Sequence, residues 1–319
     1  MAGRRGSANG VDPAGPRVVV ADASAGRHWS KSWSRQLLGY LAVGPVVLLL
    51  MALLVYPLLR TFNQSLYDVR PALQKNEFVG LDGFSDLIAD PIFWTVFVNS
   101  LVWTIAVVGL QFAVGMLGAF VLDRAFPGRW LLRGLAILPW AIPGVVAAMV
   151  WRLIYDPQIG TLQIITGPLG IPPLDVLGRP GSALWGVIFA AVWKGFPFWM
   201  LIVLAALQSV PKEQVEAAAI DGAGHVGVFR NVMLPSMAPV IRIGVILTSI
   251  WTFNYFEMVY VMTKGGPVQS SHIFPTIIYE EAFRKLDFGD SSRFAVISML
   301  LLLVLAIFFV REARKSEAL

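Results

Sequence analysis

The sequence predicts an all-α polytopic membrane protein with six transmembrane helices. Of the 319 residues, 56% are hydrophobic and 14% are charged, and the mean hydropathy is +0.68. A soluble domain carries roughly 25% charged residues, whereas about 20 consecutive apolar residues suffice to cross a bilayer. Six windows of roughly that length contain at most two charged residues each. The composition therefore excludes a soluble enzyme, a collagen and a disordered scaffold.

The six predicted spans follow one another along the chain, with more polar segments between them. They comprise residues 37–59, 92–122, 131–155, 183–210, 243–263 and 294–310. In the third span Arg133 and Arg152 lie near the ends, from which a long side chain reaches the interface. The remaining charges within spans are Lys194 in the fourth and Glu257 in the fifth.

Prolines within the spans predict bent helices. Pro139 and Pro143 are expected to kink the third span and Pro197 the fourth, because proline removes a helical hydrogen bond. Broken helices often line transport cavities. The alternative is that these prolines are simply tolerated, as they often are in membrane helices.

The basic residues set the orientation of the spans. With the N-terminus in the cytoplasm, the inside segments hold 15 of the 25 Lys and Arg residues and the outside segments hold nine, with Lys194 inside a span. Cytoplasmic loops carry the basic excess, so we expect both termini in the cytoplasm. The net charge of +5 then reflects topology and not a nucleic-acid partner.

The two ends of the chain are polar. Residues 1–36 are rich in Gly, Ala, Ser, Pro and Arg and predict a disordered cytoplasmic tail. Residues 312–319 are expected to form a cytoplasmic C-terminal tail. The first span exceeds the length of a signal-peptide core, so we expect it to remain uncleaved.

The sequence lacks the residues that several kinds of catalytic or binding site require. The chain has no cysteine and three histidines, so disulfides and Cys nucleophiles are excluded and a metal cluster is not expected. The spans hold no His/Asp/Glu constellation suited to a membrane-embedded hydrolase or transferase. A GxxxxGK motif followed by Ser or Thr, which would cradle a nucleotide, is also absent. We therefore expect no catalytic residue, no metal site and no cofactor in this chain, and any energy source must be another polypeptide.

Residues 211–239, between the fourth and fifth spans, predict two short helices joined by a turn. Pro211 suits a first helical position, and residues 212–220 are helix formers with three consecutive alanines. The pair Asp221-Gly222 ends this helix, and a second short helix is expected to end before Pro235. Small and apolar residues displayed in this way predict a docking element for a partner. The alternative is an amphipathic loop on the lipid headgroups, for which three alanines form a poor face.

This segment resembles the EAA loop of permease subunits in binding-protein-dependent ABC importers. The residues that carry the resemblance are Glu216, Ala217, Ala218, Asp221, Gly222, Ala223, Phe229, Leu234, Pro235 and Pro239. The similarity extends over nearly all of residues 37–311. Two further motifs belong to it, Trp193-Lys194-Gly195-Phe196-Pro197-Phe198 and Phe253-Asn254-Tyr255-Phe256-Glu257. The second motif resembles the carbohydrate-importing class, in particular its maltose-type first permease, in which the usual residue at 257 is Asp.

The resemblance implies a six-helix permease domain over residues 37–311, in which residues 211–239, the coupling loop, dock in a cleft of a cytoplasmic ATPase. It implies a second homologous permease, two ATPase subunits that bind ATP and Mg, and an extracytoplasmic substrate-binding protein. It also implies a multi-pass protein of a bacterial or archaeal cytoplasmic (inner) membrane. The function would be uptake of a sugar or related polyol by alternating access.

The charged residues within spans point to a candidate substrate pathway. A charge near the bilayer centre is costly, so Lys194 and Glu257 should face protein or water and not lipid. Asn, a carboxylate and aromatic rings together suit sugar hydroxyls and the apolar face of a pyranose. The alternatives are a structural ion pair or a snorkelling lysine, and an interfacial belt for the aromatic residues. The candidate pathway residues are Trp251, Asn254, Tyr255, Glu257 and Lys194.

A free-standing secondary transporter of a small polar solute is the alternative function. Such a protein would normally need more spans, inverted repeats and carboxylates that bind the coupling ion. Glu257 alone is available for that coupling. The sequence therefore favours the importer subunit.

Overall fold

The computed structural model describes residues 40–317, with side chains as far as Arg311, in two units divided between Leu58 and Leu59. The predicted tail 1–36 lies outside the described residues. The helix that starts in the first unit runs from Tyr40 to Ser65; a π-helical turn, η1 (Met51–Val55), precedes its last part, α2 (Tyr56–Ser65). None of its most apolar 18-residue window is buried within the protein, as expected for side chains that face lipid.

The predicted all-α membrane class is confirmed. In the described chain, five helices are long and apolar enough to cross a membrane, and a sixth span results if the bent pair α5 and α6 is counted as one. The described strands are two short ones, β1 (Tyr67–Arg70) and β2 (Lys75–Phe78), paired antiparallel around the short 3-10 turn η2 (Pro71–Leu73). This hairpin lies between α2 and α3 (Asp82–Ala89) in the chain.

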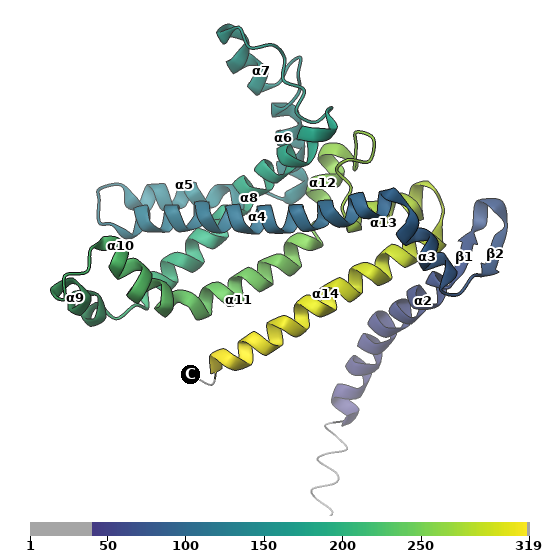
Figure 1. Ribbon diagram of the computed structural model, residues 1–319, viewed down its shortest axis with the longest axis horizontal. Helices are drawn as coiled ribbons and strands as arrows, with labels where there is room; N and C mark the ends of the chain where they lie inside the picture. Colours follow the sequence, from purple (N-terminus) through teal and green to yellow (C-terminus); the bar gives the residue numbers. More distant parts are fainter. Residues whose placement is uncertain (1–39, 318–319) are drawn as a thin grey trace, which may run out of the picture. The chain divides into compact units, whose positions relative to one another are not determined.

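Helices α4 (Pro91–Asp123) and α8 (Pro180–Gln208) pack against each other in the larger unit (Figure 1). The predicted spans 92–122 and 183–210 fall on these two helices, and α8 continues through Pro197. Asp90 caps α4 by accepting the N–H of Ile92 at 2.8 Å. The two helices approach closely at Gly115, where an added Cβ would lie 2.7 Å from the backbone nitrogen of Met200. Gly115 is therefore a packing residue.

The third span is a broken pair and not the single kinked helix predicted over 131–155. Helices α5 (Arg129–Ala141) and α6 (Gly144–Ile154) are bent by 95° at Ile142 and Pro143. Proline has no N–H and disfavours helical geometry in the residue before it, and Ile142 accordingly has a ψ of 133°. Pro139, in contrast, lies inside α5.

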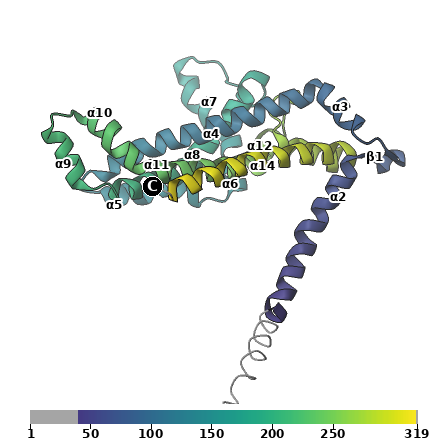
Figure 2. The same cartoon turned by 60° about the horizontal axis from the view of Figure 1, so that its bottom comes forward.

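The connection from α6 to α8 contains α7 (Thr161–Thr166) and a short 3-10 turn, η3 (Gly167–Leu169). This segment stands away from the other helices of its unit (Figures 1 and 2). Helix α9 (Lys212–Ile220), at the residues for which a helix was predicted, follows α8 and forms a second projecting element (Figure 1).

The fifth span begins earlier than predicted and is interrupted. The segments α10 (His225–Val228), η4 (Phe229–Met233) and α11 (Leu234–Phe253) form one continuous helix. The prediction of a short helix that ends before Pro235 is therefore wrong. A π-helical turn precedes Pro235, which occupies the first turn of α11, where its missing N–H is best accommodated.

The predicted span 243–263 is corrected at its centre. After Phe253 the chain leaves helical geometry at Asn254 and Tyr255, and α12 (Phe256–Thr263) follows. The carbonyl of Thr252, near this end of α11, accepts the indole N–H of Trp103 at 2.8 Å. A side chain from α4 thus supplies a hydrogen-bond donor to a backbone carbonyl at this break.

The chain continues through α13 (Phe274–Tyr279) and a π-helical turn, η5 (Glu280–Arg284), to α14 (Phe288–Glu317). The predicted sixth span 294–310 lies within α14, which packs against α11 and α13 (Figure 1). Helix α14 continues to Glu317 and thus includes most of the predicted C-terminal tail 312–319.

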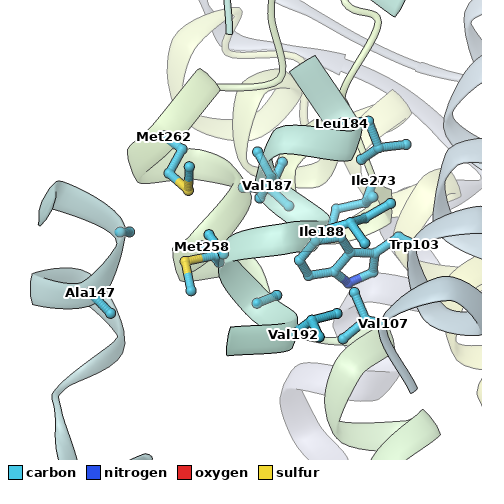
Figure 3. Packing of buried hydrophobic residues seen from close by; sticks show 14 of the residues in the cluster. Trp103, Val107, Ala147, Leu184, Val187, Ile188, Val192, Met258, Met262 and Ile273 are labelled. Atoms are coloured by element: carbon cyan, nitrogen blue, oxygen red, sulfur yellow. The ribbon is translucent and has the colours of Figure 1, made fainter. Parts of the chain in front are cut away.

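A buried apolar cluster joins α4, α6, α8 and α12. Trp103 and Val107 from α4 meet Val187 and Ile188 from α8, with Met258 from α12 packed beside them (Figure 3). All of these side chains are at most 1% exposed. The cluster fixes α12, and hence the break before it, against the two central helices.

Arg293 connects the C-terminal end of α2 to the start of α14. The side chain is 4% exposed, and its Nε and Nη2 donate to the carbonyl oxygens of Ser65 and Tyr67 at 3.1 and 2.9 Å. Its Nη1 pairs with Asp290. Arg70 in β1 adds an ion pair with Asp287 at 2.7 Å. Asp287 and Asp290, which precede and begin α14, are thereby joined to the hairpin.

His272 lies buried in the connection between α12 and α13. Its side chain sits against Gly265, where an added Cβ would collide with the imidazole ring, and its Nδ1 lies 3.1 Å from the hydroxyl of Thr276. Burial, assisted by the positive charge of Lys285, lowers the pKa of His272 from 6.5 to about 4. The folded protein therefore holds this imidazole neutral.

We expect the pH dependence of stability to change when His272 is replaced by Gln. An unfolded chain protonates this histidine near its ordinary pKa, so the folded state loses stability as the pH falls from 6.5 towards 4, by about 3 kcal/mol. His272→Gln should flatten this part of the dependence. Thermal unfolding of the purified protein measured across this pH range checks the slope. The exposed His225, replaced by Gln, is the control; equal slopes for both variants would contradict the prediction.

Candidate functional site

An open cavity of about 200 Å³ lies among the helices of the larger unit. Its walls come from α4, α5, α8 and α11 and from the break after α11. The lining residues are Gln111, Trp140, Ala191, Lys194, Gly195, Phe198, Thr248, Trp251, Thr252 and Tyr255. The cavity therefore lies where both interrupted spans meet the central helices.

Aromatic side chains form a continuous part of the wall. The rings of Trp140 and Phe198 stack at 6.2 Å with an interplanar angle of 27°, and Trp251 lies 5.6 Å from Phe198. Because each ring comes from a different helix, the wall depends on the packing of α5, α8 and α11. Such faces suit the apolar C–H surface of a sugar ring.

Polar groups interrupt this aromatic surface. Gln111 from α4 donates to the carbonyl of Ala191 at 2.9 Å. Its amide leaves no space above Gly195, where an added Cβ would collide with it. Thr248 hydrogen-bonds to the carbonyl of Gly244 at 2.7 Å. The hydroxyl of Thr248 and the amide of Gln111 are thus held in place by backbone partners before any solute binds.

Three of the five predicted pathway residues line the cavity, namely Lys194, Trp251 and Tyr255. Asn254 does not; its amide donates to the carbonyl of Ile250 at 3.0 Å, and the side chain is exposed. Glu257 also lies outside the lining, against Gly144 at the start of α6. In the described chain Lys194 and Glu257 form no salt bridge, so the structural ion pair considered as an alternative is not observed.

Sequence reasoning missed several lining residues. Gln111 is a lone amide in an apolar span, and the cost of burying it would have been a usable signal. Thr248 and Thr252 share one helical face with Trp251, at i, i+4 and i+3. Trp140 and Phe198 carry no such signal, because aromatic residues occur throughout the spans.

The predicted coupling loop forms a second candidate site. Helix α9 is followed by a tight turn in which Gly222 adopts a φ of +83°, a left-handed conformation that favours glycine. The N–H groups of Asp221 and Ala223 donate to the carbonyls of Ala217 and Ala218, each at 3.0 Å. These bonds close the C-terminal end of α9.

The exposed residues of this loop are small, apolar or charged. Glu216, Ala217, Asp221, Gly222 and Pro235 are exposed, whereas Ala218, Ala223, Phe229 and Leu234 are half-buried. Phe229 packs against Phe120 of α4 at 5.5 Å. Ile220, next to the turn, is 86% exposed. The loop thus combines a surface free to contact a partner with a fixed attachment to the spans.

The apolar helices and the cavity between them define a helical membrane protein with an internal binding site. Comparison with known proteins is more specific. Residues 111–313 match the binding-protein-dependent transport system inner membrane component, and the chain belongs to this family. It is a permease component and not an enzyme, as predicted, and the family decides against the free-standing secondary transporter.

Named relatives cover almost the whole chain. The trehalose/maltose transport system permease protein MalF of Thermococcus litoralis is 30% identical over 277 residues, 87% of this chain and 94% of the relative. The sn-glycerol-3-phosphate transport system permease protein UgpA of Yersinia pseudotuberculosis is 34% identical over 289 residues, 90% of this chain and 97% of the relative.

A solved structure shares the fold. A chain of a bacterial ABC transporter involved in the import of the acidic polysaccharide alginate superposes with a TM-score of 0.76 at 20% identity, covering 90% of this chain and 98% of that one. A second structure of a bacterial alginate ABC transporter, in complex with a periplasmic protein that holds an alginate pentasaccharide, gives a TM-score of 0.74 at 19% identity. The predicted class of permease fold is confirmed.

Proposed function

We propose that this chain is the permease subunit through which an ATP-driven importer moves a sugar or related polyol across the membrane. The observation that carries the proposal is the cavity, in which stacked aromatic faces alternate with hydroxyl and amide groups. Apolar walls with a few fixed polar groups are typical of small-molecule sites. The names of MalF and UgpA, which refer to trehalose, maltose and sn-glycerol-3-phosphate, support the same class of solute.

The proposed complex contains a second homologous permease, two ATPase subunits and an extracytoplasmic substrate-binding protein. ATP and Mg bind to the ATPase subunits, and this chain contributes the coupling loop that docks on one of them. The exposed turn at Gly222 and the small residues of α9 support this role, because they let another backbone approach closely. Both chain ends then lie in the cytoplasm.

Transport would proceed by alternating access. ATP binding draws the ATPase subunits together, the docked loops follow, and the spans rock so that the cavity opens to one side and then to the other. Trp251, Tyr255 and Lys194 line that cavity, whereas Asn254 and Glu257 are not among its lining residues.

Reconstitution of the complete complex tests this function. Proteoliposomes that contain both permeases and the ATPase should take up solute only with internal ATP and external loaded binding protein. Trp251→Ala should lower the uptake rate by about tenfold or more, since it removes one aromatic face of the cavity. Uptake of radiolabelled sugar and ATP hydrolysis, measured in the same vesicles, give the result.

Trp185→Ala is the matched control. Trp185 lies on α8 with 54% of its surface exposed, close to the 55% of Trp251, but outside the cavity. It should transport like the unmodified protein. Equal losses in both variants would indicate a general effect of removing tryptophan, and unchanged uptake by Trp251→Ala would remove Trp251 from the pathway.

A further inference from the structure

The break between α5 and α6 leaves backbone groups without helical partners beside the cavity. The last four carbonyls of any helix lack an intrahelical N–H. Beyond α5 the chain cannot supply one at Pro143, which has no N–H, and Ile142 is extended. Unsatisfied backbone groups are strongly disfavoured at membrane depth. Something other than the helix itself must therefore bond these carbonyls.

Lys194 provides the bonds. Its ammonium, from α8, donates to the carbonyl oxygen of Ile142 at 2.7 Å and to that of Trp140 at 3.3 Å. An ammonium has three N–H donors and no acceptor, so two of the three are engaged by the end of α5. A positive charge at this end is also favoured by the helix dipole.

Glu257 faces the other side of the break. Its Oε2 lies so close to Gly144, the first residue of α6, that a Cβ added there would collide with it; the hydroxyl of Tyr255 would lie 3.0 Å from the same Cβ. The N-cap residue of α6 is Pro143, whose side chain offers no hydrogen bond. A carboxylate is favoured at a helix N-terminus, and glycine at 144 gives it the room.

From this arrangement we infer that Lys194 and Glu257 are positioning residues that hold the broken span bent at the wall of the cavity. Lys194, from α8, hydrogen-bonds to the carbonyl end of α5, and Glu257, from α12, places its carboxylate against the amide end of α6. The bend fixes Trp140, which lies at the end of α5 and lines the cavity. Lys194 and Glu257 thus serve the backbone and not a charged solute.

Distances across the bend test the inference directly. The chain has no cysteine, so Leu132→Cys in α5 and Met149→Cys in α6 introduce the only two labelling sites, both exposed. Helix geometry places these positions about 25 Å apart along a straight span and about 18 Å apart at the observed bend. Spin labels on the assembled transporter in lipid, read by pulsed electron resonance, distinguish the two.

Lys194→Met should broaden the distance distribution and shift its mean towards the longer value, and Lys194→Arg should restore the short distance. Glu257→Gln should shift the mean distance in the same direction. This variant gives a second test if the Lys194→Met protein does not assemble. Lys264→Met, an exposed lysine beyond α12, is the control and should leave the distance unchanged. A distribution unaltered by both Lys194→Met and Glu257→Gln would overturn the inference.

Uptake by the same variants adds a functional readout. Lys194→Met should lower the uptake rate about tenfold, and Lys194→Arg should recover most of it. If Lys194 bound an anionic solute instead, Lys194→Met would reduce uptake without altering the distance, which would also refute a positioning role. Because the distance measurement needs no transported solute, it stands apart from the proposed function.

Discussion

Replacing Gly222 by Asp is expected to abolish ATP-dependent uptake. Gly222 has a φ of +83°, and an added Cβ would meet nothing within 4 Å in this chain. The substitution therefore strains the backbone, by about 1–2 kcal/mol for an ordinary residue, but it blocks no internal contact. Asp tolerates the left-handed conformation better than most residues. A complete loss would thus reflect the surface that Gly222 presents to the ATPase.

Two further substitutions separate the backbone from the docking contact. Asn matches Asp in size and tolerance of positive φ but carries no charge, whereas Ala is small but more strained. If docking dominates, Asp and Asn should both reduce uptake by about tenfold or more, and Ala should reduce it less. Co-purification of the ATPase subunit and uptake by proteoliposomes measure the two effects.

Gly128→Asp is the matched control for this series. Gly128 also has a left-handed φ, +84°, and open space around its Cβ position, but it lies in the connection between α4 and α5. It should assemble and transport normally. Normal transport by Gly222→Asp, in a complex that contains the ATPase, would refute the role of this turn in coupling.

Replacing Gly115 by Val is expected to prevent stable folding. A Cβ at this position would lie 2.6 Å from the Cβ of Trp199 and 2.9 Å from the carbonyl oxygen of Phe196. These atoms belong to or adjoin the α8 backbone and cannot move without separating α4 from α8. Overpacking of this kind typically costs about 1–3 kcal/mol even where side chains can adjust. We expect the amount of folded protein in the membrane to fall by about tenfold.

Gly109→Val isolates the effect of the contact. Gly109 lies on the same helix, and an added Cβ would meet nothing within 4 Å, so the two variants share the helix propensity change and differ in packing. Size-exclusion profiles and thermal unfolding of the detergent-solubilised proteins compare them. A Gly115→Val protein with a normal yield and melting temperature would show that the helices are not in close contact there.

The apolar windows were sufficient to predict the helical membrane class, because charge is so unevenly distributed along this chain. The break at Pro143 was also foreseeable in kind, since a proline cannot continue the helical ladder. Its angle was not, because the angle depends on the contacts of α5 and α6 with other helices. The interruption at Asn254 and Tyr255 had no local signal, as neither proline nor glycine occurs there.

The candidate cavity was only partly predictable for a related reason. Lys194 and Glu257 stood out because a charge in a span requires a polar partner, but the sequence alone does not show which group that partner is. The structure places Lys194 on backbone carbonyls and Glu257 beside a glycine. Gln111 enters the cavity from a helix more than 80 residues earlier than Lys194 in the chain, and such proximity follows only from the packing of α4 against α8.

The continuous helix from His225 to Phe253 connects the coupling loop directly to the cavity wall. Its 29 residues extend about 43 Å, at 1.5 Å per residue, from the turn after Gly222 to the residues around Trp251. A tilt of only about 5° at one end displaces the other by about 4 Å, roughly the width of a methyl group. If the coupling loop docks as proposed, a small movement at that end is enough to change the shape of the cavity.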